Sequence, residues 1–284
     1  MLLKKFGYLF CALFLPSINI ATAVTELDFI YIGDSEHDSL LGVKQGIDES
    51  NLQGEFLGQK YNLEIVSKEN IGEYDFSKYI AILTSLDSKQ LISLAKQLNN
   101  TPVFNLADES DDLRHKCIAN ILHIAPSNKM KSDALKQLAI KKPTSKANAQ
   151  ALHYSFVKFA ARDLNKRFKK NFQVKMNDHS WAGWAAVKMT SDTVARTQIT
   201  SPDDMLKYLK NELTFDGQKG SDMNFRVTGQ LRQLIILVEN DKIITEAPIR
   251  GIAKPPSLDS LGILECMILN LKKLRSLINE FSLD

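Results

Sequence analysis

The sequence predicts an α/β protein with a doubly wound, mostly parallel sheet flanked by helices. Short apolar runs rich in β-branched and aromatic residues alternate with helical patterns over the first half of the chain. Polar residues that can cap a helix follow several of these runs. Strands that alternate with helices at this spacing indicate parallel pairing with crossover helices.

Residues 27–32 (LDFIYI) are the first predicted strand, and a polar loop leads from Gly33 into a helical pattern. Residues 61–66 (YNLEIV) and 79–84 (YIAILT) are the next two strands, and Asp87 is placed to cap a following helix. Two further apolar runs complete the series, at residues 102–105 and 120–124.

The pattern changes after Pro126. A helix is predicted over 130–142, and residues 139–150, which include KKPTSKANAQ, lack apolar periodicity and indicate a linker. Later elements are three helices at about 150–170, 178–196 and 202–213, and strands near 224–226, 234–238 and 243–246. A C-terminal amphipathic helix carries Met267, Leu271, Leu274, Ile278 and Phe281 on one face. It either docks on the domain or contacts a partner or membrane surface.

Residues 1–23 have the three-part form of a secretory signal peptide. Lys4 and Lys5 precede an apolar run over 6–15, and Ala21-Thr22-Ala23 is a small-residue cleavage site. The run is too short to span a hydrocarbon core of roughly 30 Å, although a non-cleaved anchor is the alternative. We therefore expect a mature chain of residues 24–284 in the periplasm.

The mature chain would keep two cysteines, Cys117 and Cys266, in an oxidising compartment. Two are enough for one disulfide, and two separate buried thiols are the alternative.

Charge and motifs exclude several classes of function. The formal net charge is +3 and falls to +1 without Lys4 and Lys5, which argues against a general nucleic-acid binder. The chain has no G-x-S-x-G, P-loop, G-x-G-x-x-G or C-x-x-C motif, and its five histidines show no H-x-x-x-H spacing. The acidic stretch 108–112 lacks the ligand spacing of a calcium loop. No metal, cofactor or catalytic group is predicted, and we expect a protein that is not an enzyme.

Ligands of open α/β sheets bind beyond the carboxyl ends of the strands. Ser35, Ser85, Asn105 and Asp108 follow three of the predicted strands, so they are the candidate contacts for a small polar solute. Trp181 is a candidate wall of the ligand cleft, and core packing is the alternative for this side chain.

The C-terminal half carries a more specific pattern. The segments 181–197 (WAGWAAVKMTSDTVART), 206–238, which contains NFRVTGQLRQLIIL, and 258–266 (LDSLGILEC) resemble a family of periplasmic substrate-binding proteins. These proteins belong to ABC transporters encoded alongside pyrroloquinoline-quinone-dependent alcohol oxidation. The segments 54–66 (GEFLGQKYNLEIV) and 103–130, which contains Cys117, are similar to the first lobe of the same family.

The resemblance implies a type I periplasmic-binding-protein fold, in which two α/β lobes close over a solute. Members of the family carry roughly 100 more residues, about one lobe, where this sequence has only the linker-like stretch. We therefore expect one full lobe, built from about 24–125 and 150–235, with a reduced or missing second lobe and C-terminal strands and helix over 236–284.

Two functions from different classes follow. The first is a non-catalytic solute-binding protein of an ABC transporter linked to quinoprotein alcohol oxidation, with a permease or alcohol-oxidation proteins as partners. The second is a protein-interaction or accessory module that uses the same scaffold without a small-molecule ligand. Membrane contact is expected only through partners or the C-terminal helix.

Overall fold

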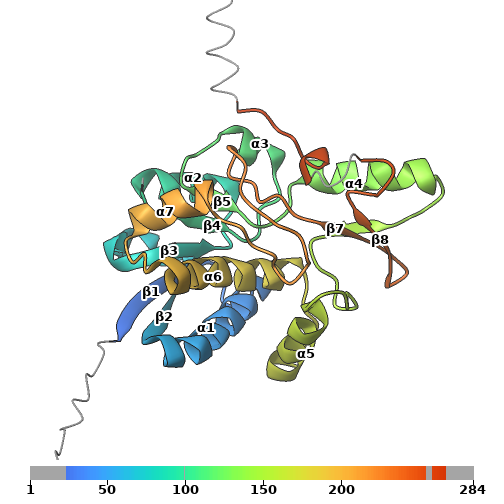
Figure 1. Cartoon of the computed structure of the whole chain (residues 1–284). Coiled ribbons are helices and arrows are strands. Elements are labelled where there is room, and N and C mark those ends of the chain that lie inside the picture. Colours follow the sequence, from blue (N-terminus) through green and yellow to red (C-terminus); the bar gives the residue numbers. More distant parts are fainter. Residues whose placement is uncertain (1–23, 99, 254–257, 267–284) are drawn as a thin grey trace, which may run out of the picture.

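The structure is a computed structural model that describes residues 24–98, 100–253 and 258–266. The first part of the chain alternates between strands and helices, as Figure 1 shows. Its elements are β1 (Thr25–Ile32), α1 (Asp38–Leu57), β2 (Gln59–Val66), β3 (Tyr79–Thr84), α2 (Ser88–Gln97), β4 (Val103–Asn105), α3 (Asp111–His115) and β5 (Ile121–His123). The later elements are α4 (Asn128–Lys141), β6 (Asn148–Gln150), α5 (Ala161–Phe172), α6 (Asp178–Thr197), α7 (Pro202–Asn211), β7 (Ile235–Glu239) and β8 (Lys242–Ala247).

A five-stranded sheet in the order β2-β1-β3-β4-β5 forms the body of the protein, and all its pairs are parallel. Side chains of β1, an inner strand of this sheet, alternate between two cores. Phe29 and Tyr31 pack with α1, α6 and α7, whereas Ile30 and Ile32 pack with α2 on the other face. The sheet is therefore covered on both faces, which is why the inner strand β3 (YIAILT) is almost entirely apolar and fully buried, whereas the edge strand β2 is only partly buried.

Helices α1 and α6 lie side by side on one face of the sheet (Figure 1) and pack through glycines. A Cβ atom at Gly42 would lie 1.7 Å from the backbone oxygen of Ser180, and one at Gly183 would lie 2.1 Å from that of Ser39. No side chain larger than hydrogen fits at either position without moving a helix. These two residues therefore set the distance between the helices.

A small antiparallel sheet, β6-β7-β8, lies beside the body of the protein and is covered by α4 (Figure 1). Ile235 and Leu237 of β7 point toward α4 and pack with Met130 and Leu138. Ile236 and Val238, on the other face of β7, join the core of the large sheet instead. The small sheet thus has one core of its own and shares a second with the body.

Three predictions for the later elements are corrected. Residues 148–150, expected to be part of a linker, form β6, because Ala149 pairs with Leu237 and is buried. The helix expected from residue 150 begins only at Ala161. Residues 224–226 make an isolated bridge through Phe225 and belong to no named strand.

Cys117 and Cys266 form a disulfide with a Cα–Cα distance of 5.6 Å. Of the two predicted alternatives, one disulfide or two separate thiols, the structure has the disulfide. The bond attaches the end of the described chain to the segment after α3. The signal peptide expected at residues 1–23 and the helix expected after Cys266 lie outside the described residues. Among the helices that are described, none is long and apolar enough to cross a membrane.

Candidate functional site

The carboxyl ends of β1, β3 and β4 meet at one edge of the large sheet, because these strands are parallel neighbours. The loops that follow them lead to the N-termini of α1, α2 and α3. Backbone N–H groups at helix N-termini favour anionic or polar groups. This edge is therefore the candidate site, and the structure places four of the five predicted residues on its loops and strand ends.

The two serines differ in their surroundings. Ser85 is half-buried, and its Oγ accepts a hydrogen bond of 2.8 Å from the Tyr31 hydroxyl, which also lies 3.0 Å from Ser39 Oγ. Burial raises the pKa of Tyr31, which remains a hydrogen-bond donor. Ser35 is exposed on the loop after β1. The Tyr31 hydroxyl thus fixes the position of the Ser85 hydroxyl, whose own proton can be donated to another acceptor.

Asn105 is fully buried, and its side chain forms hydrogen bonds with the loop that follows it. Its Nδ2 donates to the backbone oxygen of Asp108 at 2.8 Å and contacts His123 Nδ1 at 2.9 Å. Its Oδ1 accepts from the backbone N–H groups of Ala107 and Asp108, at 3.2 and 2.9 Å. Every polar atom of this side chain has a partner, so Asn105 shapes the site and has no group left for a ligand.

Asp108 is half-buried between two helix N-termini. Its carboxylate accepts from the Ser110 amide at 2.7 Å and from the Ser88 hydroxyl at 2.5 Å. The guanidinium of Arg114, which has no exposed surface, lies 3.9 Å away. These partners hold the carboxylate in one orientation at the edge of the sheet.

Trp181 lies in the core, with no exposed surface. Its Nε1 donates to the backbone oxygen of Gly217 at 3.2 Å, and the ammonium of Lys219 lies 3.9 Å from the centre of its ring. Trp181 is therefore a core residue and does not form a wall of the ligand cleft.

A pair of histidines also lies at this edge and was not predicted. His37 caps α1 by accepting from the Ser39 amide, and its ring lies 4.9 Å from that of His179, edge to face. His179, in the first turn of α6, contacts the backbone oxygen of Leu106 through Nδ1. Burial, followed by the neighbouring His179, lowers the pKa of His37. Two histidines so far apart in sequence give no signal before the fold is known.

Lys131 of α4 reaches toward the same edge. Its Nζ lies 2.5 Å from the Glu109 carboxylate and 3.4 Å from that of Asp178. A hollow of about 330 Å³ opens beside it, lined by Lys131, Asn148, Ala149, Gln150, Asn177, Asp178 and His179. The hollow therefore lies between the large sheet's helix α6 and the small sheet.

Two further carboxylates of the acidic stretch after β4 contact α4. Asp111 accepts from the Lys129 amide at 2.9 Å, and Glu109 pairs with Lys131. In the described part of the chain, no group of three or more His, Cys, Asp or Glu side chains could hold a metal ion.

A buried lysine joins two segments that connect the sheets. Lys219 Nζ donates to the backbone oxygens of Ala151 and Leu234 and to Oε1 of Gln233, at 2.9, 3.1 and 3.0 Å. Its side chain has no exposed surface, and burial lowers its pKa to about 7. The segments after β6 and before β7 therefore share one attachment point.

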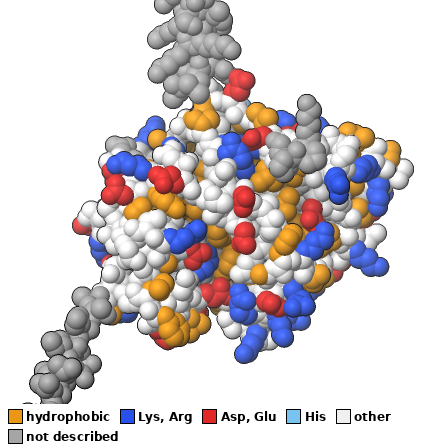
Figure 2. All heavy atoms as spheres, in the orientation of Figure 1, with side chains coloured by type: hydrophobic (Ala, Val, Ile, Leu, Met, Phe, Trp, Pro, Cys, Tyr) orange, Lys and Arg blue, Asp and Glu red, His pale blue; other side chains and the backbone are white. Residues whose placement is uncertain are grey.

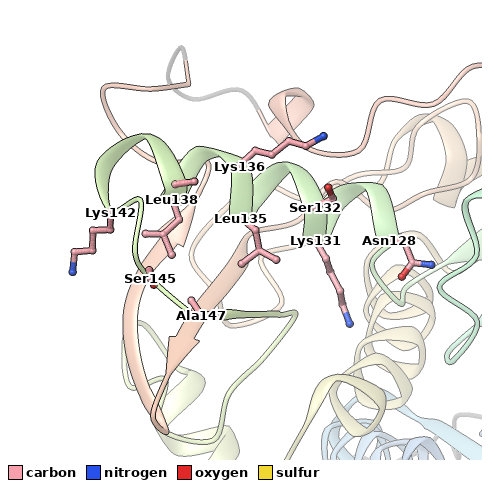
Figure 3. Close-up of a pocket in the computed structure, with 10 residues that line it drawn as sticks. Asn128, Lys131, Ser132, Leu135, Lys136, Leu138, Lys142, Ser145 and Ala147 are labelled. Carbon is pink, nitrogen blue, oxygen red and sulfur yellow. The ribbon is translucent and has the colours of Figure 1, made fainter.

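Two surface features lie outside the edge of the large sheet. A groove of about 580 Å³ follows α4, where Leu135 and Leu138 point toward Ser145 and Ala147 (Figure 3). Lys and Arg side chains gather over α5 (Figure 2), from Arg162, Lys166, Arg167, Lys169 and Lys170. Neither feature includes a residue predicted for the ligand site.

No family model matches the chain, and no curated protein matches it in sequence. Solved structures do resemble it. An ABC transporter substrate-binding protein from Desulfitobacterium hafniense is 11% identical with a TM-score of 0.65, and the match covers 77% of this chain and 99% of that protein.

Two further structures are similar over nearly their whole length. One is a branched-chain amino acid ABC transporter periplasmic ligand-binding protein from Burkholderia xenovorans LB400, 11% identical with a TM-score of 0.64, matching 78% of this chain and 95% of its own. The other is a leucine-binding protein from Thermotoga maritima, 10% identical with a TM-score of 0.60, matching 76% and 97%. The fold class is thereby confirmed as that of type I periplasmic binding proteins.

Proposed function

We propose that this protein is a periplasmic, non-catalytic solute-binding protein that delivers a small polar solute to an ABC permease. The observation that carries the proposal is the polar edge of the large sheet, where three loops and three helix N-termini converge. Ligands of open α/β sheets bind at such an edge. The names of the similar structures, two of which bind or transport branched-chain amino acids, support this class of function.

The proposed solute contacts are Ser35, Ser85 and the outer side of Asp108. The Ser85 hydroxyl can donate to a solute oxygen, and helix N-terminal amides favour a carboxylate. Asp108 would bind an ammonium group. An amino acid offers both charges, so we propose amino acids as the solute class. Asn105 and Trp181 support this surface from the loop and from the core.

The small sheet with α4 is, in this proposal, a reduced second lobe. It carries three strands and one described helix beside a five-stranded body. Closure of two lobes over a solute buries most of its surface, so a reduced lobe leaves the solute partly exposed and lowers affinity. The segments that resemble the alcohol-oxidation family suggest that the solute belongs to a system linked to quinoprotein alcohol oxidation.

The proposal is tested by thermal shift with a panel of amino acids, small carboxylates and alcohols, followed by calorimetric titration. We expect at least one solute to raise the melting temperature, and Ser85→Ala to weaken its binding. Ser132→Ala, on α4 and outside the edge, is the matched control. Binding that is equal in both variants would contradict the proposed site.

An interaction module without a solute is the second candidate, and the same experiment distinguishes it. No stabilisation by any member of the panel, together with a periplasmic protein that co-purifies at fixed stoichiometry, would replace the solute-binding proposal with this one.

A further inference from the structure

A second hollow lies on the face of the small sheet that α4 does not cover. Its volume is about 620 Å³, and it lies among the end of β8, the loop after Lys219 and the segment before α5. Glu246 of β8 pairs in register with Ile236, whose side chain points away from α4. The hollow shares no described lining residue with the edge of the large sheet, and its volume is typical of small-molecule sites.

Phe159 lies at the mouth of this hollow in an unfavourable conformation. Its φ is 53°, in the left-handed region, and 60% of the residue is exposed. The ring packs over Gly220, where a Cβ atom would lie 2.2 Å from Phe159 Cε1. A left-handed backbone is unfavourable for a residue other than glycine, and such strain occurs at functional sites. The Phe159 ring is thus held in a strained conformation although most of it is exposed to water. A ligand that packs against the ring would explain both features.

The polar groups around the hollow include two opposite charges that have no partner among the described residues. The side chains of Asp222 and Arg250 make no hydrogen bond or ion pair within the described residues. Ser221 Oγ is buried and also lacks a partner there. Glu246, by contrast, pairs with Lys158 at 2.6 Å. Within the described part of the chain, the hollow therefore presents one carboxylate and one guanidinium without partners, and one buried hydroxyl.

Apolar residues also line the hollow, namely Leu234, Pro248, Ala253 and Leu258. A guanidinium binds carboxylates through two parallel hydrogen bonds, and aromatic rings pair edge to face or offset. Unpartnered charges of both signs beside an apolar wall are complementary to a ligand that carries both charges and an apolar group.

We propose that this hollow is a second ligand site, which binds a zwitterion with an aromatic side chain. The ligand's carboxylate contacts Arg250 and the Ser221 hydroxyl, its ammonium contacts Asp222, and its ring packs against Phe159. The site is separate from the solute site proposed above and does not depend on it.

The test is a titration of the ¹⁵N-labelled mature protein with three probes, followed by NMR. The probes are L-phenylalanine, phenylacetate, which lacks the ammonium, and phenethylamine, which lacks the carboxylate. We expect saturable shifts of the Gly220, Ser221 and Asp222 amides, with L-phenylalanine binding at least about tenfold more tightly than either analogue. Shifts at the loops after β1, β3 and β4 report on the first site, so the two proposals fail or succeed separately.

Two variants locate the contacts. Arg250→Gln removes the guanidinium from an exposed position, and Phe159→Asn removes the ring while keeping a residue type that tolerates left-handed φ. Each should raise the Kd for L-phenylalanine about tenfold or more, whereas Arg196→Gln, on the exposed side of α6, should leave it unchanged. The proposal is overturned if Arg250→Gln behaves like Arg196→Gln, or if phenylacetate binds as tightly as L-phenylalanine.

Discussion

Replacing Gly183 by alanine tests the close contact between α1 and α6. The added Cβ would lie 2.1 Å from the Ser39 oxygen and 2.9 Å from the Val43 nitrogen, and both atoms belong to the backbone. Ordinary contact begins at 3.4 Å, so the helices must separate by about 1.3 Å. A gap of this size loses a quarter to a half or more of the dispersion energy of the atoms across it.

The helix propensity of alanine opposes this loss with a gain of about 1 kcal/mol. Overpacking of a core typically costs 1–3 kcal/mol, and here no flexible side chain can move aside. We therefore expect the upper end of this cost less the helix-propensity gain, a net loss of about 2 kcal/mol in the free energy of unfolding, which is a large share of a typical 5–15 kcal/mol.

Urea unfolding measures this loss, with fluorescence of Trp181 and Trp184 as the probe, since both lie in α6. With a slope of about 3 kcal/mol per molar urea, the midpoint should fall by about 0.7 M. The control is Gly72→Ala, because a Cβ at Gly72 would meet no heavy atom within 4 Å. If Gly183→Ala unfolds at the same urea concentration as Gly72→Ala, the argument from helix contact is wrong.

Three further predictions concern single groups. Reduction of the Cys117–Cys266 disulfide, whose residues are 149 apart in sequence, should lower the free energy of unfolding by up to about 4–5 kcal/mol, measured by urea unfolding with and without dithiothreitol. Lys219 has a pKa of about 7 in the folded protein against 10.5 as its ordinary value, so the unfolded chain binds more protons between these pH values. Stability should therefore rise from pH 7 to pH 10 by up to about 1.4 kcal/mol per pH unit, and Lys219→Met should lose this slope in urea titrations at pH 7.5 and 9.5. Asn105→Ala leaves His123 and two backbone amides without their partner and should lower the melting temperature by several degrees in calorimetry, unlike Asn62→Ala at a half-buried position of the edge strand β2.

The fold of the large sheet could be predicted because its inner strands are buried on both faces and have short apolar sequences rich in β-branched and aromatic residues. The small sheet was partly missed, since β6 has three residues and only Ala149 of them is buried. Such a short strand exists through its pairing with β7, a contact that no local pattern reveals.

For the candidate site, the sequence predicts which loops form it but not which side chains face a ligand. Strand ends identify Ser85 and Asp108, because the loop positions follow from the strand pattern. The strand ends do not show that the polar atoms of Asn105 are all hydrogen-bonded within the protein. Nor do they show that the Trp181 side chain is buried in the core. The pair of His37 and His179 was not predicted, because it depends on the packing of α1 against α6.

The position of α6 has a consequence for the order of folding. The face of the large sheet that carries Phe29 and Tyr31 is completed by α6 and α7, which follow all five strands in the chain. A nascent chain therefore exposes this apolar face until residue 209 or so has been made, and its contacts of long sequence separation form late. During synthesis the first half of the protein remains open, and a chain that ends before α6 cannot close this core.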